Sequence, residues 1–591
     1  MEKMIKVADY IMSFLSEKGI KFAFEVPGGG AMFLNDAITR SSISPVFFHH
    51  EQACAMAAVG YSKLNNEVAL VVPTSGCGST NTITGILDAW QDSNPVIIVS
   101  GQANKKDTTY MSKVPLRKLG VQEVNIVEIM KPITKYITMV DDPKDIVYKL
   151  EKAYHLCTTG RPGPVWLDVP MDVQSADISP DSLKRFIIDK DQQDIVNESD
   201  FEKYLKKSKR PIIIAGNGIH LANAREEFRE FIEHYNIPCT FTFLGTDLIP
   251  SDHPLYIGRI GIKGTRAGNF AVANSDLVIS IGSSLSIPSI GFKYELFARE
   301  AKKIVVDIDK NEHLKDTIKI DSIIEMDAKQ FMIKNMSTEY KTLDRWRKRC
   351  ARWKFKWPVF DRPDIDKLNM YSFSKKLSEI TKDVEASVVV DAGSAYYVMA
   401  QTMTDNRLIL PSTQGEMGFT IPASIGVYLA DQSMEVLAIT GEGSFQFNIQ
   451  ELQTIVHNKM PIKIFILNNG GYLSIKNTQI KYFNNRFSGV DPGSGISFPE
   501  CEKIATAYGL KFYKISNMQE LNQLLPEIIN YKGYCLCEIV CPPDEKIYPT
   551  AASKQEQDGR LVSQPLENMA PFLSEKELNE EMIIPLNEVL K

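Results

Sequence analysis

Two polar turns in the last third of the chain carry residues that suit magnesium and phosphate. Glu442 stands in a Gly-Glu-Gly turn after the apolar run 436–439, and Asn469 follows the apolar run 462–467. A strand–helix–strand unit with a right-handed crossover brings the carboxyl ends of both strands to one edge of the sheet. A carboxylate, an amide oxygen and phosphate oxygens are ligands that Mg²⁺ accepts. The stretch therefore predicts a metal and phosphate site, with a helix over 444–458 between the strands. A Gly-x-Gly turn alone also fits an ordinary crossover.

A second set of polar residues lies at the ends of apolar runs in the first third of the chain. The run 22–26 precedes the turn 27–30, the run 46–48 ends just before Glu51, and the turn 74–81 follows a third run. Alternating strands and helices predict a parallel α/β sheet, in which such residues collect at the carboxyl ends of the strands. We therefore expect Glu51 and both glycine turns at one edge of one sheet.

The same alternation continues along the chain. It predicts three doubly wound parallel-sheet α/β domains at 1–175, 195–335 and 371–550, followed by a tail at 551–591. The segment 345–357 interleaves basic and aromatic residues, a pattern seen in nucleic-acid binding. Because the total charge is acidic, the segment fits better as an amphipathic linker helix that buries its tryptophans.

Composition limits the classes of protein that the chain can belong to. Its 591 residues are 44% apolar and 24% charged, which is typical of a globular protein. The net charge of −6 offers no electrostatic footprint for nucleic acid. No apolar run reaches the roughly 18 residues of a membrane helix, and nine scattered cysteines fit reduced thiols. We expect a soluble, cytoplasmic protein without nucleic-acid or membrane partners.

Taken together, these motifs resemble those of thiamine diphosphate enzymes of the acetolactate synthase-like group, large catalytic subunit type. The resemblance covers nearly the whole chain, and the motifs agree with the family in order and spacing. The stretches that carry it are Val26-Pro27-Gly28-Gly29, His50-Glu51-Gln52, 74–81, 92–95, Ser100-Gly101-Gln102, Gly415-Glu416-Met417-Gly418 and 441–469.

The resemblance implies a pyrimidine-binding first domain, a central domain that holds flavin in many members, and a third domain that binds diphosphate and Mg²⁺. It also implies active sites formed between the first domain of one chain and the third domain of another, so we expect a homodimer or homotetramer. Thiamine diphosphate and Mg²⁺ are the implied cofactors. FAD stays open because part of the flavin-contacting stretch is altered, and so does a role of the tail 551–591 as a lid.

The resemblance also assigns catalytic roles. Glu51 is implied to hydrogen-bond N1′ of the aminopyrimidine ring and so to prepare removal of the proton at C2. Gly28 and Gly29 are implied to let the backbone approach the reacting carbon, which a side chain would obstruct. Gln102 and Gln122 are implied to lie near the substrate.

Further roles concern the metal and the body of the cofactor. The implied metal ligands are Glu442, Asn469 and the carbonyl of Gly471. Met417 is implied to wedge under the cofactor. Besides Glu51, the implied cofactor contacts are Val26, Pro27, Ser75, Asn81, Gly393, Ser394, Gly415, Met417, Gly441, Gly443, Ser444, Asn469, Gly471 and Tyr472.

Several positions depart from the family pattern. Glu442 stands where the family has aspartate, and it reaches about one carbon–carbon bond further. The segment 283–288 lacks the arginine that holds the carboxylate of the second oxo acid, and the Gly-Gln-His-Gln motif becomes 393–397. An acceptor carboxylate ordinarily wants a bidentate arginine. Either the acceptor is not a simple 2-oxo acid, or a group such as Arg259 or Lys263 anchors it.

The expected activity follows from the resemblance. We expect a carboligase that decarboxylates a 2-oxo acid, pyruvate by resemblance, and passes the two-carbon unit to a carbonyl acceptor. One branch makes acetolactate, and the other adds the unit to a nucleotide-linked keto-sugar, which the lost arginine favours. The alternative is a non-oxidative decarboxylase that releases aldehyde. A regulatory homologue without catalysis is a third interpretation, and Glu51 argues against it.

Overall fold

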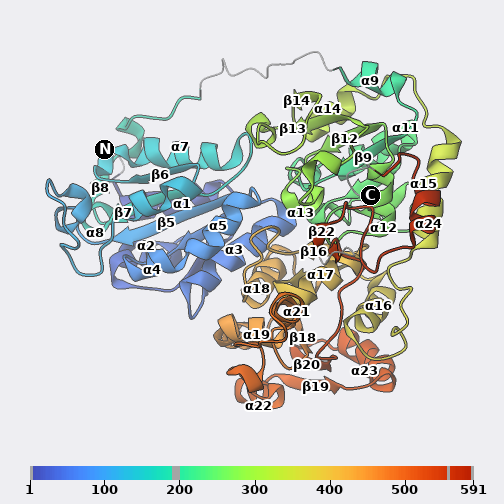
Figure 1. Ribbon diagram of the computed structural model, residues 1–591. Coiled ribbons are helices and arrows are strands. Elements are labelled where there is room, and N and C mark those ends of the chain that lie inside the picture. The colour runs from blue at the N-terminus through green and yellow to red at the C-terminus, as the bar shows by residue number, and fades with distance from the viewer. Residues whose placement is uncertain (1–3, 189–199, 556–559, 587–591) are drawn as a thin grey trace.

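The computed structural model describes residues 4–188, 200–555 and 560–586, and Figure 1 shows three α/β bodies in this part of the chain. Each is built on a six-stranded sheet in which all neighbouring strands run parallel. Strands such as Val96–Gln102 are buried along their whole length because helices cover both faces of the sheet. The predicted fold class, three doubly wound parallel-sheet domains, is confirmed, while the exact domain bounds stay a prediction.

The first sheet has the strand order β3-β2-β4-β5-β7-β6. The strands are β2 (Phe22–Glu25), β3 (Ser44–Phe47), β4 (Ala69–Val72), β5 (Val96–Gln102), β6 (Tyr136–Met139) and β7 (Val165–Pro170). One face packs on α1 (Val7–Glu17), α2 (Met32–Thr39) and α7 (Ile146–Thr158). The other face packs on α3 (Glu51–Asn65) and α5 (Ile83–Gln91). The direction of winding reverses between β2 and β4, and ligands of such sheets bind at that point.

The central sheet has the order β11-β10-β9-β12-β13-β14, with its reversal between β9 and β12. The strands are β9 (Pro211–Ala215), β10 (Cys239–Phe241), β11 (Tyr256–Arg259), β12 (Leu277–Ile281), β13 (Lys302–Asp307) and β14 (Ser322–Glu325). Helices α11 (Arg225–Tyr235) and α14 (Ala328–Lys334) pack on one face, and α12 (Arg266–Ala273) packs on the other.

The third sheet, β16-β15-β17-β18-β20-β19, repeats the winding of the first, with its reversal between β15 and β17. The strands are β15 (Ala386–Val390), β16 (Arg407–Ile409), β17 (Glu435–Gly441), β18 (Lys463–Asn468), β19 (Lys511–Ile515) and β20 (Cys535–Val540). Helices α16 (Met370–Thr381), α17 (Gly393–Thr402) and α23 (Met518–Asn530) pack on one face. Helices α18 (Thr420–Ala430), α20 (Leu452–His457) and α22 (Cys501–Tyr508) pack on the other.

The first and third domains share one apolar core, in which α3 lies against α18. Glycines bring the two helices into backbone contact. A Cβ atom at Gly60 would lie 2.4 Å from the carbonyl oxygen of Ala423, and one at Gly426 would lie 1.9 Å from that of Ala57. Larger residues at either glycine would force the domains apart, so the sequence of these helices fixes how the two domains sit together.

The linker helix and the last helix of the tail pack on the central domain (Figure 1). The linker helix α15 (Asp344–Lys356) buries Trp346 and Trp353, as its amphipathic pattern predicts. The tail contains α24 (Glu575–Glu581), where a carboxylate oxygen of Glu581 accepts a hydrogen bond from Trp353 Nε1 at 2.8 Å. A lid role for the tail stays a prediction.

One predicted element is wrong. The helix expected over 444–458 is three short segments, α19 (Glu442–Phe445), a 3₁₀ helix (Gln446–Glu451) and α20, because Asn448 has a non-helical backbone. Its side-chain amide donates to the carbonyl oxygen of Gly418 at 2.9 Å, a contact that sequence periodicity does not reveal. In the described residues no helix is long and apolar enough to cross a membrane.

Candidate active site

The carboxyl ends of β17 and β18 bring Glu442 beside Asn469 and Gly471. Gly441 pairs with Leu467 in the ladder, so the two turns leave the sheet side by side. Oε1 of Glu442 accepts hydrogen bonds from the backbone N–H groups of Asn469 at 3.2 Å and Gly471 at 2.6 Å. The three predicted metal ligands therefore converge at the edge where the strand pattern placed them.

This edge fits a metal only with help from a phosphate. Among the described residues there is no group of three or more His, Cys, Asp or Glu side chains that could hold an ion. The neighbouring Asn468 donates to Glu538 at 2.6 Å, which occupies its amide nitrogen. Burial raises the pKa of Glu442 to about 7, as expected for a carboxylate that no cation compensates. One buried carboxylate with backbone and amide oxygens is the donor set that Mg²⁺ completes with phosphate oxygens.

Open backbone surrounds this edge. Gly393, the first residue of α17, and Gly415 have φ angles of +80° and +61°. A Cβ atom at either residue, or at Gly441, would meet no atom within 4 Å. Gly443 differs, because a Cβ there would lie 2.1 Å from the ring of Tyr472. The predicted cofactor contacts therefore divide into glycines that border free space and a Gly443–Tyr472 pair that packs together.

Ser444 joins the loop before α18 to the sheet. Its hydroxyl donates to Asp391 at 2.7 Å and accepts the backbone N–H of Gly418 at 2.9 Å. Burial raises the pKa of Asp391 to about 6, against the lowering effect of its hydroxyl partners. Met417 is half-buried on this tethered loop, and Ser394 is buried in the first turn of α17. Ser444 thus holds the segment that carries the predicted wedge.

Glu51 opens α3 at the edge of the first sheet. Its Oε2 accepts a hydrogen bond from the side-chain amide of Asn81 at 2.9 Å. A Cβ atom at Gly78 would lie 3.1 Å from Oε1, so the carboxylate rests on a residue without a side chain. The helix is capped by His50, whose Nδ1 accepts the N–H of Gln52 at 3.1 Å. Glu51 is therefore not needed as a helix cap. Its carboxylate is positioned by Asn81, which the sequence predicts to be a cofactor contact.

The two glycine turns interlock at the reversal point between β2 and β4. A Cβ atom at Gly28 would lie 2.5 Å from Cβ of Thr74, and one at Gly30 would lie 2.5 Å from Oγ of Ser75. Only glycine allows these turns to meet. The remaining residues of the first turn are half-buried or exposed: Val26, Pro27 and Gly29.

The two glutamines that are predicted to lie near the substrate differ in burial and in contacts. Gln102 is buried, and its side-chain nitrogen donates to Asp168 at 3.0 Å and to the carbonyl of Val124 at 2.9 Å. Its side-chain oxygen accepts the N–H of Ala103 at 2.9 Å. The polar atoms of Gln102 are thus engaged inside the domain, where they hold the loop, and its place near the substrate stays a prediction. Gln122 is exposed, with a positive φ of 51°.

Within one chain, the Glu51 edge and the Glu442 edge are joined only indirectly. The contacts between them come from neighbouring residues. The N–H of His49 donates to Glu451 at 3.1 Å, and the amide of Asn448 donates to Gln52 at 3.3 Å. In the described residues the Glu51 carboxylate has Asn81 as its side-chain partner and reaches no residue of the Glu442 edge.

Comparison with known proteins identifies the family. Models of the thiamine pyrophosphate enzymes match residues 5–129 (N-terminal TPP binding domain), 200–334 (central domain) and 391–539 (C-terminal TPP binding domain). A probable acetolactate synthase large subunit of Methanocaldococcus jannaschii is 32% identical over 566 residues, covering 92% of this chain and 93% of its own. The chain belongs to the thiamine pyrophosphate enzymes.

Other relatives agree with this assignment; thiamine pyrophosphate and thiamine diphosphate are the same compound. The acetolactate synthase large subunit of Lactococcus lactis is 31% identical over 93% of this chain and 95% of its own length. The acetolactate synthase isozyme 1 large subunit of Escherichia coli is 30% identical over 92% of this chain and 95% of its own length. The predicted resemblance is confirmed, and the chain is acetolactate synthase-like over nearly its whole length.

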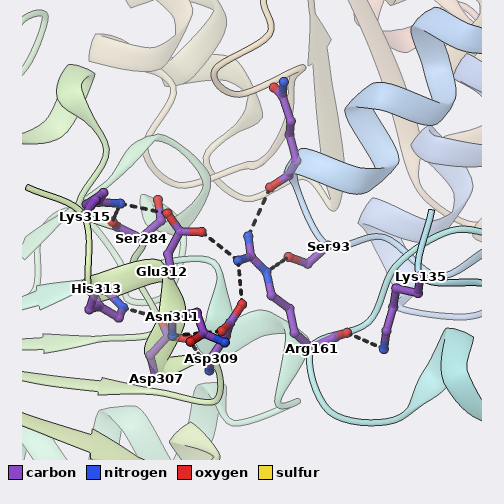
Figure 2. A network of polar contacts seen from close by, with 11 residues as sticks. Ser93, Lys135, Arg161, Ser284, Asp307, Asp309, Asn311, Glu312, His313 and Lys315 are labelled. Atoms are coloured by element: carbon purple, nitrogen blue, oxygen red, sulfur yellow. Dashed lines mark hydrogen bonds and ion pairs between the residues drawn. The ribbon is translucent and has the colours of Figure 1, made fainter. Parts of the chain in front are cut away.

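In this thiamine pyrophosphate enzyme, a pocket of about 380 Å³ lies where all three domains meet. It opens at the reversal point of the central sheet, with Asn217 after β9 and Ser283 after β12 in its wall. Figure 2 shows Arg161 of the first domain reaching Asp309 at 3.2 Å and Glu312 at 2.8 Å in the central domain. This network ties the first domain to the rim of the pocket.

The sequence did not predict a buried charged cluster of this thiamine pyrophosphate enzyme, which lies beside the loop 415–418 before α18. Lys63 donates to Asp88 at 2.9 Å, to Asp92 at 2.7 Å and to the carbonyl of Leu410 at 2.8 Å. Glu416 lies against the same group, and in the described part of the chain neither of its buried carboxylate oxygens has a hydrogen-bond partner. Burial, and then Asp88, raise the pKa of Glu416 well above its ordinary value. No local pattern points to this cluster, because Lys63 and Leu410 are far apart in the sequence.

Proposed function

We propose that the protein is a thiamine diphosphate-dependent carboligase that takes pyruvate as donor and passes its two-carbon unit to a carbonyl acceptor. The observation that carries this proposal is the Glu51 carboxylate, held by Asn81 at an open sheet edge. The relatives, which are named as acetolactate synthases, support pyruvate as the donor. A simple decarboxylase that releases aldehyde is the competing activity.

The roles of the chain's own residues follow from the geometry. Bound thiamine diphosphate supplies the reactive carbon and the electron sink for decarboxylation. Glu51 would exchange a proton with the pyrimidine ring at N1′, because its Oε1 is free while Asn81 holds Oε2. Gly29, where a Cβ atom would meet nothing within 4 Å, would leave room for substrate above the ring, and Gly28 would let its backbone approach while it packs on Thr74. Glu442, Asn469 and Gly471 would hold Mg²⁺ and through it the diphosphate.

A second copy of the chain is part of the proposed site, because the resemblance implies active sites between the first domain of one subunit and the third domain of another. In the described residues no hydrogen bond joins the side chains of Glu51 and Glu442. The loop before Gln122 supports this, because it exposes several large apolar side chains that a second subunit would cover. They are Tyr110, Met111, Val114, Leu116, Leu119 and Val121.

The three-domain pocket is the proposed flavin site. Its volume lies within the range of small-molecule sites, and the buried Oδ1 of Asn217 has no partner among the described residues. A nucleotide would satisfy that acceptor, and the reversal point of a 3-2-1-4-5-6 sheet is where dinucleotides bind. Purified protein that is yellow would support FAD, and colourless protein with active turnover would refute it.

Removal of divalent metal should weaken the binding of thiamine diphosphate by at least about tenfold, because one carboxylate and two carbonyl-type oxygens cannot hold a diphosphate without the ion. Glu442→Gln should weaken binding to a similar degree and should abolish its dependence on Mg²⁺. Titration calorimetry with and without chelator measures both. Glu538→Gln, which alters a neighbouring carboxylate outside the ligand set, should bind normally. Unchanged cofactor affinity after metal removal would refute the assignment of Glu442.

Product analysis tests the function itself. Pyruvate alone should yield carbon dioxide and acetolactate if a second oxo acid is the acceptor. Carbon dioxide that depends on an added nucleotide-linked keto-sugar would identify the second branch instead. Stoichiometric acetaldehyde at full rate without an acceptor would show the competing decarboxylase. No release of carbon dioxide from pyruvate under any condition would refute the proposed donor.

A further inference from the structure

A basic cluster without carboxylate partners lies between the central and third domains. We use this term for Arg259 at the end of β11, Lys263 in the loop before α12, and Lys481 near the end of α21 (Leu473–Tyr482). In the described parts of the chain none of these three cations forms an ion pair. Arg259 is buried and Lys263 is half-buried, whereas Lys481 is exposed. Buried or partly buried cations normally have an anionic partner, since an unpaired buried charge is unfavourable.

Arg259 is committed to the fold. It is 1% exposed, and its guanidinium donates to the carbonyl of Ala400 and, at 3.0 Å, to the carbonyl of Lys263. Its carbon centre lies 4.2 Å from the ring centroid of Phe243. Two nitrogens of this side chain therefore fix the loop that carries Lys263, while its buried Nε has no partner among the described residues. Of the two anchoring groups left open by the sequence, Arg259 already donates to two backbone carbonyls, which favours Lys263.

Lys263 is free by contrast. In the described residues its ammonium group has no hydrogen-bond acceptor, and it lies 5.2 Å from the ring centroid of Tyr397. Burial, with a further contribution from Lys481, lowers the pKa of Lys263 to about 8. An aromatic face compensates a cation only in part. The missing component is an anion, which the described residues do not supply.

The position of Lys263 connects it to the active site. Tyr397 lies one helical turn after Gly393, so both residues share a face of α17. The loop is held by the N–H of Ile262, which donates to the carbonyl of Pro288 at 2.8 Å. Pro288 belongs to the segment 283–288, in which the sequence lacks a cation for the acceptor. Lys263 therefore brings positive charge next to that segment and over the helix that starts at the cofactor edge.

Resting on the proposed function, we propose that Lys263, with Lys481 beside it, binds an oxyanion of the acceptor substrate. Both a carboxylate of a 2-oxo acid and a phosphate of a nucleotide-linked sugar have this chemistry. A charge-assisted hydrogen bond to such a group makes Lys263 a specificity-determining residue for the second half of the reaction. It has no part in the first half, in which the donor loses carbon dioxide.

The test uses holoenzyme saturated with thiamine diphosphate and Mg²⁺. Titration calorimetry measures the binding of two unreactive probes, oxamate for the carboxylate and uridine diphosphate for the phosphate. Lys263→Gln should weaken at least one probe by about tenfold or more, and Lys481→Gln should weaken the same probe. Lys263→Arg should restore binding. Lys476→Gln is the matched control, because Lys476 lies on the same helix but pairs with Asp491 at 3.0 Å.

The affected probe identifies the acceptor's anionic group. Loss of oxamate binding indicates a carboxylate, and loss of uridine diphosphate binding indicates a phosphate. The proposal is overturned if neither probe responds to Lys263→Gln, or if that variant loses thiamine diphosphate affinity by the same factor, which would assign the lysine to the cofactor. Single-turnover release of carbon dioxide from pyruvate should be unchanged in Lys263→Gln. If the parent enzyme released no carbon dioxide from pyruvate, the proposed function would be refuted. The probe-binding measurements would still test the role of the two lysines.

Discussion

Glu51→Gln should lower turnover of pyruvate by about 10²- to 10⁴-fold, the range typical of a general acid–base group. Glutamine keeps the size of the side chain and can still contact Asn81 through its oxygen. It cannot share a proton with the pyrimidine ring. The binding of thiamine diphosphate should therefore change little, because the proposed site for the diphosphate and metal is the Glu442 edge. Carbon dioxide release measures turnover, and exchange of the C2 proton in deuterated water measures the step directly.

The matched control is Glu17→Gln. Glu17 is the last residue of α1, which covers the face of the sheet opposite to α3. Its replacement by glutamine removes the same negative charge as Glu51→Gln. It should turn over pyruvate at the parent rate. If Glu51→Gln retained full turnover and normal C2 exchange, the carboxylate would have no catalytic role and the proposed mechanism would be wrong. If that variant instead lost its affinity for thiamine diphosphate, the role of Glu51 would be to bind the cofactor.

The parts of the site that follow strand ends could be predicted from the sequence. Glu442 and Asn469 converge because β17 and β18 are parallel neighbours, and parallel strands end at the same edge. The contact of Asn81 with Glu51 also lies within one sheet edge. In each case the apolar run that fixes the strand also fixes the place of the polar residue after it.

Other features depend on contacts that no local pattern encodes. The chain bends at Asn448 because its amide bonds the distant Gly418, although the apolar spacing favours a straight helix. Gln102 turns inward because Asp168 and Val124 lie on neighbouring segments. The choice between Arg259 and Lys263 likewise required the positions of their surroundings. Periodicity reports which face is buried, but not which polar groups meet there.

Lys63→Met should lower the free energy of unfolding by about 3–5 kcal/mol, the range for removing one partner from a buried ion pair. Lys63 is 3% exposed and is the cation that faces Asp88, Asp92 and Glu416. Methionine is unbranched and only one atom shorter than lysine, but it leaves the carboxylates without compensation, at the contact between α3 and the loop before α18. Unfolding followed by calorimetry should show a lower midpoint temperature. Lys21→Met, which breaks an exposed pair with Glu67 at 3.1 Å, should cost less than about 1 kcal/mol.

Glu416→Gln distinguishes loss of charge balance from loss of packing. The folded-state pKa of Glu416 is raised above its ordinary 4.5, so the folded chain keeps a proton that the unfolded chain releases. This group's contribution to stability is complete below about pH 4.5 and declines as pH rises toward the folded pKa. Glu416→Gln removes that decline, so it should raise the unfolding midpoint at neutral pH and recover part of the loss in Lys63→Met. Strictly additive effects in this double-mutant cycle would show that the two residues share no buried charge network.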